Sequence, residues 1–299
     1  MNKAEHFKSG FVAVVGRPNV GKSTMINALI GDKIAIVSDK AQTTRNRIIC
    51  VYTDEEKQIV FMDTPGVHKP KHKLGEFMVD AAIESLKETE AVLFVVAGNE
   101  KRGPGDNFII EQLKRVKVPV FLVVNKIDTL QKEQVLEAIV SYQDAYPFAG
   151  VIPISAKNKE NLSELLNVLG EHLLEGPQYF PEDMITDQPE RLIISDIVRE
   201  KILLSTRDEI PHAIAVDVDE MKTRDDGTTY IRATIYCERD SQKGIIIGNK
   251  GALLRKIGAE ARMDIQKLLA TKVYLDLWVK VKKDWRNKSG MLSELGYKK

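Results

Sequence analysis

The chain has 299 residues, of which 29% are charged and 43% are hydrophobic. This composition excludes disorder over most of the length, and at ~150 residues per domain the length predicts two domains. Because no run of about 18 apolar residues occurs and no apolar stretch follows Met1, we expect neither a transmembrane helix nor a signal peptide.

The net charge of +1 conceals an asymmetry between the two halves of the chain. Residues 1–189 carry 22 Lys and Arg against 26 Asp and Glu, whereas residues 190–299 carry 22 against 17. Residues 243–288 alone hold 12 basic and 4 acidic residues. Such a positive field suits a polyanion, either nucleic acid or an anionic membrane face, and a solvated charged surface is the simpler alternative.

Two cysteines, Cys50 and Cys237, are too few for a disulfide framework and match no zinc-binding spacing. We expect each to be a small buried residue of a protein in the reducing cytoplasm.

Residues 11–174 alternate short apolar runs with amphipathic segments. The apolar runs predict strands that are covered on both faces, at 11–16, 57–63, 91–98, 119–126 and 150–156. The segments between them predict helices at 22–30, 75–88, 106–116, 132–144 and 161–174. Strands separated by helices form a doubly wound, mainly parallel α/β sheet.

Residues 175–190 contain three prolines and little apolar periodicity, which predicts an interdomain linker. We place the first domain at 1–178, the linker at 179–190 and the second domain at 191–299. The second domain combines a helix at 190–205, alternating strands at 213–221, 228–237 and 272–283, and a basic helix at 252–270. Its order, α-β-β-α-α-β, predicts a small α+β domain.

The first strand is followed by a phosphate-binding sequence of the form GxxxxGK[ST]. Its glycines let backbone N–H groups turn towards a triphosphate, and the N-terminus of the next helix adds positive charge. Lys22 is expected to reach the β- and γ-phosphates and Ser23 to ligate Mg²⁺. The predicted nucleotide-binding residues are Gly16, Arg17, Pro18, Asn19, Val20, Gly21, Lys22, Ser23 and Thr24.

Three further motifs follow predicted strands in the order that a guanine-nucleotide site needs. Asp63 can hold Mg²⁺ through water, and the Gly66 N–H can sense the γ-phosphate. The Asp128 carboxylate can accept two hydrogen bonds from guanine, and the Ala156 N–H can donate to guanine O6. The three motifs consist of Asp63, Thr64, Pro65 and Gly66; of Asn125, Lys126 and Asp128; and of Ser155, Ala156 and Lys157. Together with the phosphate loop they predict a site for GTP and GDP.

The loop Gln42–Arg45 is a candidate switch, because a threonine there can ligate Mg²⁺ only when the γ-phosphate is present. Thr44 is favoured and Thr43 is the alternative.

Valine occupies position 67, where Ras-like proteins carry a water-orienting glutamine, so intrinsic hydrolysis should be slow. His68 and His72 lie nearby in a lysine-rich stretch that is expected to be a solvated loop. Asn19 is a candidate for holding a monovalent cation, which would neutralise developing charge between the phosphates. Lys22, Thr44 and Asn19 are therefore the predicted catalytic residues, and Ser23, Thr44 and Asp63 the predicted metal ligands.

Glycines at 248 and 251 form a GxxG sequence between an apolar and a basic segment. Small residues at both ends let a nucleic-acid backbone approach closely, whereas a helix–turn–helix packing motif is the structural alternative. The predicted RNA-binding residues are Ile247, Gly248, Asn249, Lys250, Gly251, Arg255 and Lys256. Trp278 alternates with apolar residues and is expected in the core, and Trp285 is a weaker candidate for base stacking.

In combination these motifs resemble the bacterial Era GTPases, which join a Ras-like GTPase domain to a C-terminal KH domain of type II. The resemblance rests on the stretches GRPNVGKST, QTTRNR, DTPGVHKPKHKLGEFM, NKID, SAK and IIIGNKGALLRKIG. It implies a GTPase that binds the 3′ end of small-subunit (16S) ribosomal RNA and acts in assembly of the 30S subunit. The resemblance also covers Val67, because the family lacks a catalytic glutamine at this position. Asn19 resembles the asparagine of those GTPases in this group that use potassium.

The leading hypothesis is therefore a slow GTPase that switches an RNA-binding domain, with Mg²⁺ and K⁺ as ions and with the chain acting as a monomer. Two alternatives stay open at this point. One is an RNA-binding scaffold that nucleotide regulates and for which turnover is incidental. The other is a signalling GTPase in peripheral contact with the inner face of the cell membrane.

Overall fold

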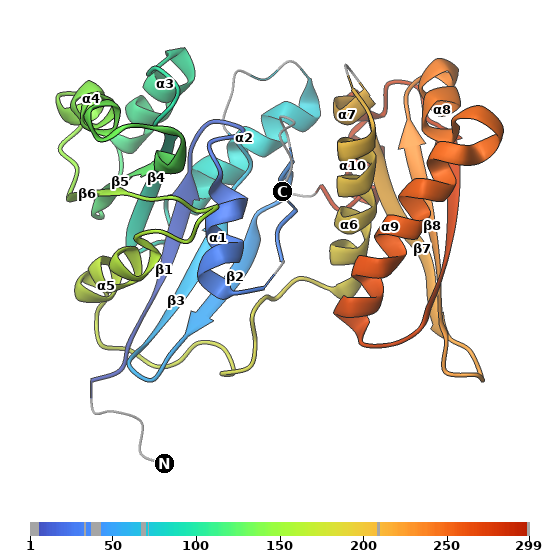
Figure 1. Cartoon of the computed structure of the whole chain (residues 1–299), viewed down its shortest axis with the longest axis horizontal. Coiled ribbons are helices and arrows are strands. Elements are labelled where there is room, and N and C mark those ends of the chain that lie inside the picture. Colours follow the sequence, from blue (N-terminus) through green and yellow to red (C-terminus); the bar gives the residue numbers. More distant parts are fainter. Residues whose placement is uncertain are drawn as a thin grey trace. The chain divides into compact units, whose positions relative to one another are not determined.

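The computed structural model describes residues 6–32, 34–36, 43–66, 70, 72–207 and 210–297. Within these ranges the chain forms two compact units, which consist mainly of residues up to Asp187 and of residues from Gln188 onwards. Each unit has its own sheet, of six and of three strands (Figure 1).

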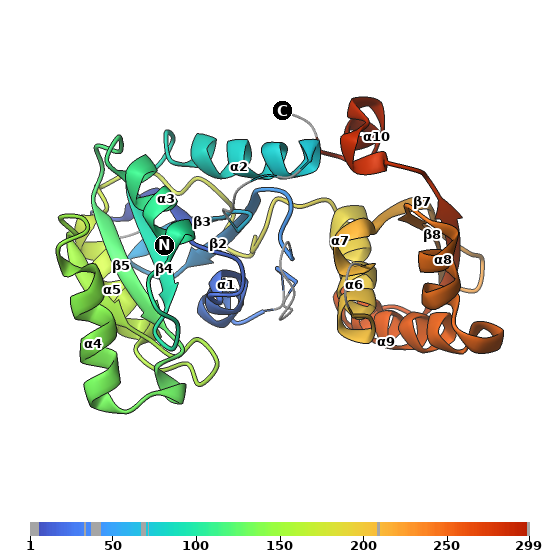
Figure 2. The same cartoon turned by 90° about the horizontal axis from the view of Figure 1, so that it is seen from above.

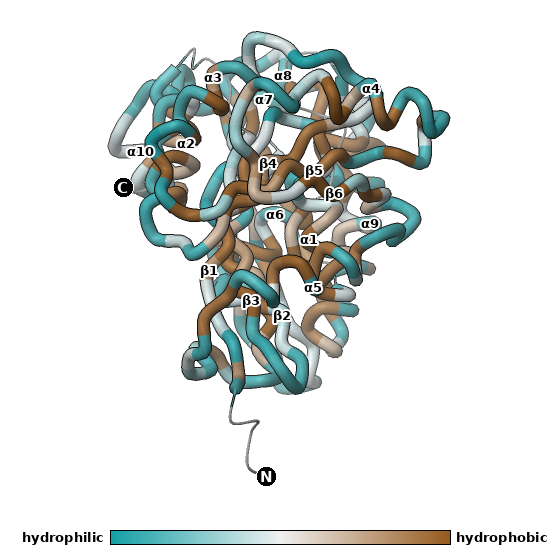
Figure 3. Tube along the Cα trace, turned by 90° about the vertical axis from the view of Figure 1, so that its left-hand side faces the viewer, coloured by the Kyte–Doolittle hydropathy of each residue, from teal (hydrophilic) through white to brown (hydrophobic). Residues whose placement is uncertain are grey.

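The sheet of the first unit has the order β2-β3-β1-β4-β5-β6, in which only the β2–β3 pair is antiparallel. Every residue of β3, β4 and β5 is buried, as strands covered on both faces require. Figure 3 shows the apolar colour gathered in these central strands. The strands are β1 (Lys8–Val15), β2 (Ile48–Thr53), β3 (Lys57–Asp63), β4 (Ala91–Ala97), β5 (Val120–Asn125) and β6 (Gly150–Pro153).

Helices cover both faces of this sheet (Figure 2). Apolar side chains of α1 and α5 pack on one face, and those of α2, α3 and α4 pack on the other. The helices are α1 (Lys22–Ile30), α2 (Lys73–Ser85), α3 (Pro104–Leu113), α4 (Lys132–Gln143) and α5 (Leu162–His172), with a short 3₁₀ turn η1 (Ile127–Thr129). The predicted doubly wound, mainly parallel α/β fold is thereby confirmed.

Strand β2 was not predicted from the sequence. Its residues IICVYT are rich in β-formers, but they follow the Thr43–Thr44 loop without a turn signal, and the strand is short. It pairs along its whole length with β3, from Ile48 opposite Asp63 to Thr53 opposite Gln58. This pairing adds the one antiparallel strand of the sheet.

Residues 175–187, the greater part of the segment expected to be a linker, are hydrogen-bonded to the first unit. The Gly176 N–H donates to Phe7 O at 3.0 Å, and the Val51 N–H on β2 donates to Ile185 O at 2.9 Å. Between these points, the buried Gln58 side chain accepts from the N–H groups of Tyr179 and Phe180 at 2.8 and 3.0 Å. The segment therefore follows the first sheet and ends along its outer strand β2.

The second unit is a three-stranded sheet of order β7-β8-β9, with the first pair antiparallel and the second parallel. One face carries the apolar core, to which α6, α8 and α9 contribute isoleucines. The elements are α6 (Glu190–Ser205), α7 (Ile210–Ala213), β7 (Ala215–Thr223), β8 (Thr229–Cys237), α8 (Asp240–Ile247), η2 (Asn249–Gly251), α9 (Ala252–Leu269), β9 (Val273–Val281), η3 (Trp285–Asn287) and α10 (Ser289–Glu294). The predicted α-β-β-α-α-β order is confirmed, and the short α7 and α10 are additions. Among the described helices, none has the length and apolar character to cross a membrane.

The two tryptophans have the opposite placement from the one predicted. Trp278 is 55% exposed and donates from Nε1 to Asp276 Oδ2 at 2.9 Å, whereas Trp285 is 0% exposed and donates from Nε1 to the Ala213 carbonyl at 2.9 Å. Trp278 is exposed because side chains alternate along β9: Val273 and Val279 face the helices, and the even-numbered residues face away. Trp285 therefore belongs to the core and does not stack on bases.

Both cysteines are buried, as predicted. Burial raises the pKa of each thiol, which leaves Cys50 and Cys237 protonated and unreactive at neutral pH.

Candidate nucleotide and RNA sites

The phosphate loop begins where β1 ends, and β1 lies between β3 and β4 in the middle of the sheet. In doubly wound sheets, ligands bind beyond the carboxyl ends of the strands, where the chain order reverses. The motifs that were singled out from the sequence follow β1, β3, β5 and β6. All four therefore reach the same edge of the sheet.

Two glycines shape the phosphate loop. A Cβ at Gly16 would lie 2.3 Å from the Val95 carbonyl oxygen, so only glycine fits against β4. Gly21 has φ +95°, and a Cβ there would lie 2.3 Å from Asn125 Nδ2. Gly21 is also the residue immediately before α1, whose first turn contains no acidic side chain. The helix N-terminus, with Ser23 and Thr24 in its first turn, thus presents positive charge to the loop.

Lys22 lies buried beneath the loop and donates from Nζ to the carbonyls of Gly16 at 3.1 Å and Arg17 at 3.0 Å. Burial lowers the pKa of Lys22 to about 8, and the Asp63 carboxylate opposes this shift. The ammonium is therefore held at the loop by weak neutral acceptors, in a place where an anion would stabilise it far more strongly.

Three side chains predicted as metal ligands meet below the loop. Ser23 Oγ donates to Asp63 Oδ2 at 2.8 Å, and Thr44 Oγ1 lies 2.9 Å from Ser23 Oγ and 3.3 Å from Asp63 Oδ2. Thr44 is buried in this group, in which its hydroxyl faces both Ser23 and Asp63. The geometry therefore favours Thr44 over Thr43 as the switch residue.

The remaining oxygen of this group suits a cation. Asp63 is fully buried, and its Oδ1 has no hydrogen-bond partner among the described residues. Burial raises the pKa of Asp63, although Lys22 and the two hydroxyls act in the opposite direction. Among the described residues, no cluster of three or more His, Cys, Asp or Glu side chains could hold a metal. One carboxylate with two hydroxyls instead fits Mg²⁺, which takes its other ligands from phosphate and water.

The segment after β3 is hydrogen-bonded to β1 and packs against the phosphate loop. Thr64 Oγ1 donates to the Val14 carbonyl at 2.7 Å. A Cβ at Gly66 would lie 2.8 Å from Pro18 Cα, so this glycine lies directly against the phosphate loop, with Pro65 before it. The residues after Gly66 that the sequence raised, Val67 and His68, lie outside the described residues, as does Gln42 before the Thr43–Thr44 pair.

The guanine-recognition motifs are joined through Asn125. Its Nδ2 donates to the Val20 carbonyl at 2.9 Å, and its Oδ1 accepts from the N–H groups of Lys126 and Ala156 at 2.8 and 3.0 Å. Ser155 Oγ donates to Asp128 Oδ1 at 2.7 Å and thereby orients this exposed carboxylate. The Ala156 N–H, expected to donate to guanine O6, has Asn125 as its acceptor here, and Lys157 is exposed beside it.

In the second unit, the GxxG loop joins α8 to α9. Gly248 and Gly251 have φ +71° and +78°, and Lys250 between them has φ +47°. A Cβ at Gly248 would lie 2.7 Å from Leu253 Cβ, whereas the space beside Gly251 is open. Asn249, Lys250, Arg255 and Lys256 are exposed, and Ile247 is half-buried against the core. The loop thus presents glycine backbone and basic side chains on one turn.

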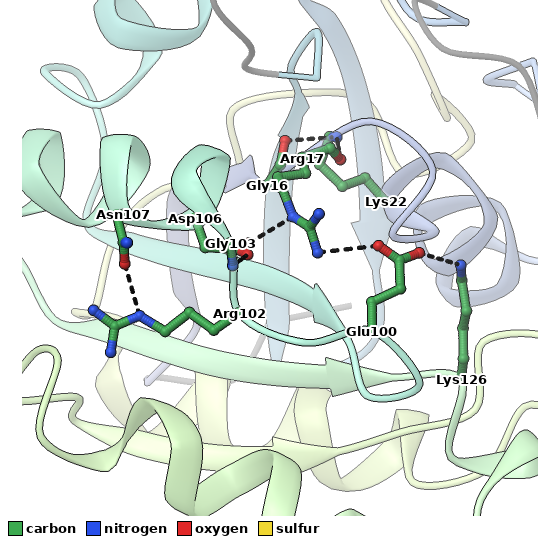
Figure 4. A network of polar contacts seen from close by, with 9 residues as sticks. All are labelled: Gly16, Arg17, Lys22, Glu100, Arg102, Gly103, Asp106, Asn107 and Lys126. Atoms are coloured by element: carbon green, nitrogen blue, oxygen red, sulfur yellow. Dashed lines mark hydrogen bonds and ion pairs between the residues drawn. The ribbon is translucent and has the colours of Figure 1, made fainter.

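Two acidic residues at the nucleotide site were missed from the sequence. Asp106 on α3 and Glu100 before it both accept hydrogen bonds from the Arg17 guanidinium, at 2.9 and 3.0 Å (Figure 4). The sequence contains one indication of the structural role of Asp106, because an acidic residue three places after Gly103 is typical of the start of a helix. Nothing in the sequence paired it with Arg17, which lies 89 positions earlier.

Comparison with known proteins gives two domain families. Residues 11–126 match a family of 50S ribosome-binding GTPases, and residues 209–286 match the KH domain family.

Two solved structures are similar over nearly the whole chain. One is Era in complex with MgGDPNP and nucleotides 1506–1542 of 16S ribosomal RNA, at 43% identity over 98% of this chain and 99% of that chain, with a TM-score of 0.95. The other is a variant of Aquifex aeolicus Era bound to GDP·AlF4⁻, at 43% identity over 97% of this chain and 99% of that chain, with a TM-score of 0.94. The motifs, the two folds and this similarity lead to one conclusion: the chain belongs to the Era family of GTPases.

Proposed function

We propose that this protein binds GTP and GDP with Mg²⁺, hydrolyses GTP, and binds the 3′ end of 16S ribosomal RNA through its KH domain during assembly of the 30S subunit. The observation that carries the proposal is the convergence of Lys22, Ser23, Thr44 and Asp63 below the N-terminus of α1. The Era relative that holds MgGDPNP and 16S RNA supports both halves.

In this proposal Lys22 binds the β- and γ-phosphates and exchanges its two carbonyl acceptors for anionic ones. Ser23 and Thr44 would hold Mg²⁺ directly and Asp63 through water. Bound Mg²⁺ supplies charge neutralisation at the phosphates. Thr44 belongs to a loop separate from the phosphate loop. In this proposal its position therefore depends on whether the γ-phosphate is bound, which is what a switch requires.

Guanine selectivity is assigned to Asp128, which Ser155 holds in place. Asn125 positions the surrounding backbone through its amide oxygen and one N–H of its amide nitrogen, and the second N–H of that nitrogen is the donor it can offer to the base. For hydrolysis, we assign the accessory monovalent-cation site, K⁺ in particular, to Asn19, whose φ of +65° lets it project from the exposed side of the loop. Lys22 and Thr44 complete the proposed catalytic set.

The lowered pKa of Lys22 predicts that nucleotide binding takes up protons. In the free protein about half of the Lys22 side chains are charged near pH 8, and bound phosphate raises the pKa and recharges them. We therefore expect uptake of about half a proton at pH 8 that rises towards one proton at pH 9, where the phosphates of GDP are fully ionised, with affinity falling as pH rises. Calorimetry of GDP binding in buffers of different ionisation enthalpy measures this uptake, and an uptake that does not change with pH would contradict it.

RNA binding is assigned to the GxxG loop, with a prediction for its lysine. Lys250→Glu should weaken binding of a 16S 3′-end RNA about tenfold and lower the salt dependence by about one counterion, because it removes one phosphate contact. Lys267→Glu is the matched control, since Lys267 is exposed near the far end of α9, the helix that follows the loop, roughly 25 Å from the loop. Equal losses for both variants would show a general charge effect and remove the loop from the site.

The whole proposal is tested with the full chain and a short single-stranded RNA copied from the 16S 3′ end, beside a scrambled RNA, at fixed salt. Sequence-selective binding with a non-hydrolysable GTP analogue but not with GDP is expected for a switch. Selective binding that ignores the nucleotide would favour the scaffold alternative. Peripheral membrane contact stays a prediction, and vesicles of anionic lipid that bind as tightly as the RNA would favour it over RNA recognition.

A further inference from the structure

An ionic cluster joins two of the nucleotide-binding motifs to each other. It consists of Arg17 from the phosphate loop, Glu100 and Asp106 from the segment after β4, and Lys126 from the motif after β5; we call it the Arg17 cluster (Figure 4). Figure 4 shows the Arg17 guanidinium between Asp106 and Glu100, with Lys126 on the far side of Glu100.

Asp106 fixes one side of Arg17 permanently. Its side chain is fully buried and both carboxylate oxygens are used, Oδ1 by Arg17 Nε at 2.9 Å and Oδ2 by the Gly103 N–H at 2.8 Å. A Cβ at Gly105 would lie 2.8 Å from Arg17 Cδ, so the start of α3 is shaped around the arginine. A buried carboxylate needs such a charged partner, and Arg17 therefore cannot leave Asp106 without a large cost.

Glu100 makes the second contact, and it is accessible to solvent. One of its oxygens lies 3.0 Å from Arg17 Nη2 and the other lies 3.6 Å from Lys126 Nζ, while 40% of its side chain is exposed. It is the acidic side chain that lies between these two cations. Without it, two positive groups from different motifs would face each other with no counter-charge between them.

The backbone shows why these two cations matter. Arg17 contributes a backbone carbonyl to the Lys22 ammonium, at 3.0 Å. Lys126 has φ +68° and directly follows Asn125, which holds the phosphate loop through Val20. Glu100 therefore adds a side-chain bridge, parallel to the Asn125 bridge, between the phosphate end and the base end of the proposed site.

We propose that Glu100 is a positioning residue that slows nucleotide release by holding the phosphate loop and the Lys126 motif together. The inference rests on the proposed nucleotide site. Glu100 contacts none of the three side chains assigned to Mg²⁺, and it does not contact the Lys22 ammonium. Its effect therefore falls on the lifetime of the bound nucleotide and not on hydrolysis. Because the bridge is partly exposed, salt weakens it.

The test is Glu100→Gln in the full chain, which keeps the size of the side chain and removes its charge. Dissociation of fluorescent GDP is expected to accelerate about three- to tenfold at low salt, the range for loss of two partly exposed ion pairs. The difference from the unmodified protein should shrink towards none near ~1 M salt. Single-turnover hydrolysis from preloaded GTP should stay within about twofold of the unmodified protein.

Glu111→Gln is the matched control. It removes the same charge from an exposed ion pair with Lys114 at 2.7 Å, on the same helix α3, and should leave dissociation unchanged. Equal rates for Glu100→Gln and the unmodified protein, a gain that ignores salt, or an equal gain in the Glu111 variant would each overturn the inference. Failure of the unmodified protein to bind GDP would instead overturn the proposed function, so the two failures are distinct.

Discussion

Lys22→Ala should abolish detectable GTP turnover, with a loss of at least about 10² to 10³-fold, while the second unit stays folded and binds RNA. A preorganised charged donor at the site where negative charge develops accounts for losses of this size when it is removed. Lys22 is buried beneath the loop, where its ammonium donates to the carbonyls of Gly16 and Arg17, and alanine supplies no charge at this place. Phosphate release and binding of a fluorescent GTP analogue measure the loss.

A matched lysine separates this effect from a general loss of charge or of packing. Lys8→Ala removes an ammonium that donates to the Gly170 carbonyl at 2.9 Å, at the opposite end of β1 from the phosphate loop. Turnover in this variant should match the unmodified protein. Normal turnover in Lys22→Ala would show that the phosphate site lies elsewhere, and loss of RNA binding in it would show that the substitution unfolds more than the site.

Asp128→Asn should convert a guanine site into one that prefers xanthine nucleotides. The carboxylate offers two acceptors to the N1–H and the amino group of guanine, whereas the amide offers one acceptor and one donor. Loss of one hydrogen bond to a charged group, with a donor now facing a guanine donor and a weaker bond at the remaining acceptor, predicts a fall in GTP affinity of about 10² to 10³-fold, with a gain for XTP. Asparagine can keep the contact with Ser155, so the backbone should not move.

The ratio of XTP to GTP affinity is the measurement for Asp128. Asp144→Asn serves as the control, because Asp144 is an exposed carboxylate at the end of α4 and in the same unit. It should leave the ratio unchanged. A preserved preference for GTP in Asp128→Asn would remove this residue from base recognition.

Local sequence was sufficient for the fold wherever a segment's own pattern decides its structure. Strand β3 has the bounds of the predicted apolar run 57–63, because burial on both sheet faces requires a continuous apolar sequence. Helix α1 spans the predicted 22–30, because the glycine before it and its apolar periodicity can both be read from the sequence. Strand β2 has no comparable local pattern, since its pairing with β3 is what makes it a strand.

The tryptophans show a second limit. Whether Trp278 faces the core depends on which of two alternating faces of β9 meets the helices, and a shift of one residue exchanges them. The apolar neighbours of Trp278 suggested burial, yet they alternate with it and so lie on the other face. Trp285 is buried by α7 and by Tyr297, neither of which the sequence placed near it.

The candidate nucleotide site was predictable to the extent that its residues are consecutive. Each motif follows a strand, and the parallel order of the strands brings them to one edge. The Arg17 cluster was not predictable, because Glu100 and Asp106 meet Arg17 only through the pairing of β1 with β4. Tertiary pairing of this kind leaves no periodic or spacing signal in a single sequence.

The course of residues 175–187 has a consequence for handling the first unit alone. An outer strand presents unpaired N–H and C=O groups, which recruit strands of other molecules and cause aggregation. Here the chain itself covers β2, through the bond from Val51 N–H to Ile185 O and the one from Thr186 Oγ1 to Ile49 O at 2.7 Å. A fragment that ends at residue 178 would expose the edge of β2 and is expected to self-associate. A fragment that extends to Asp187 keeps this edge covered.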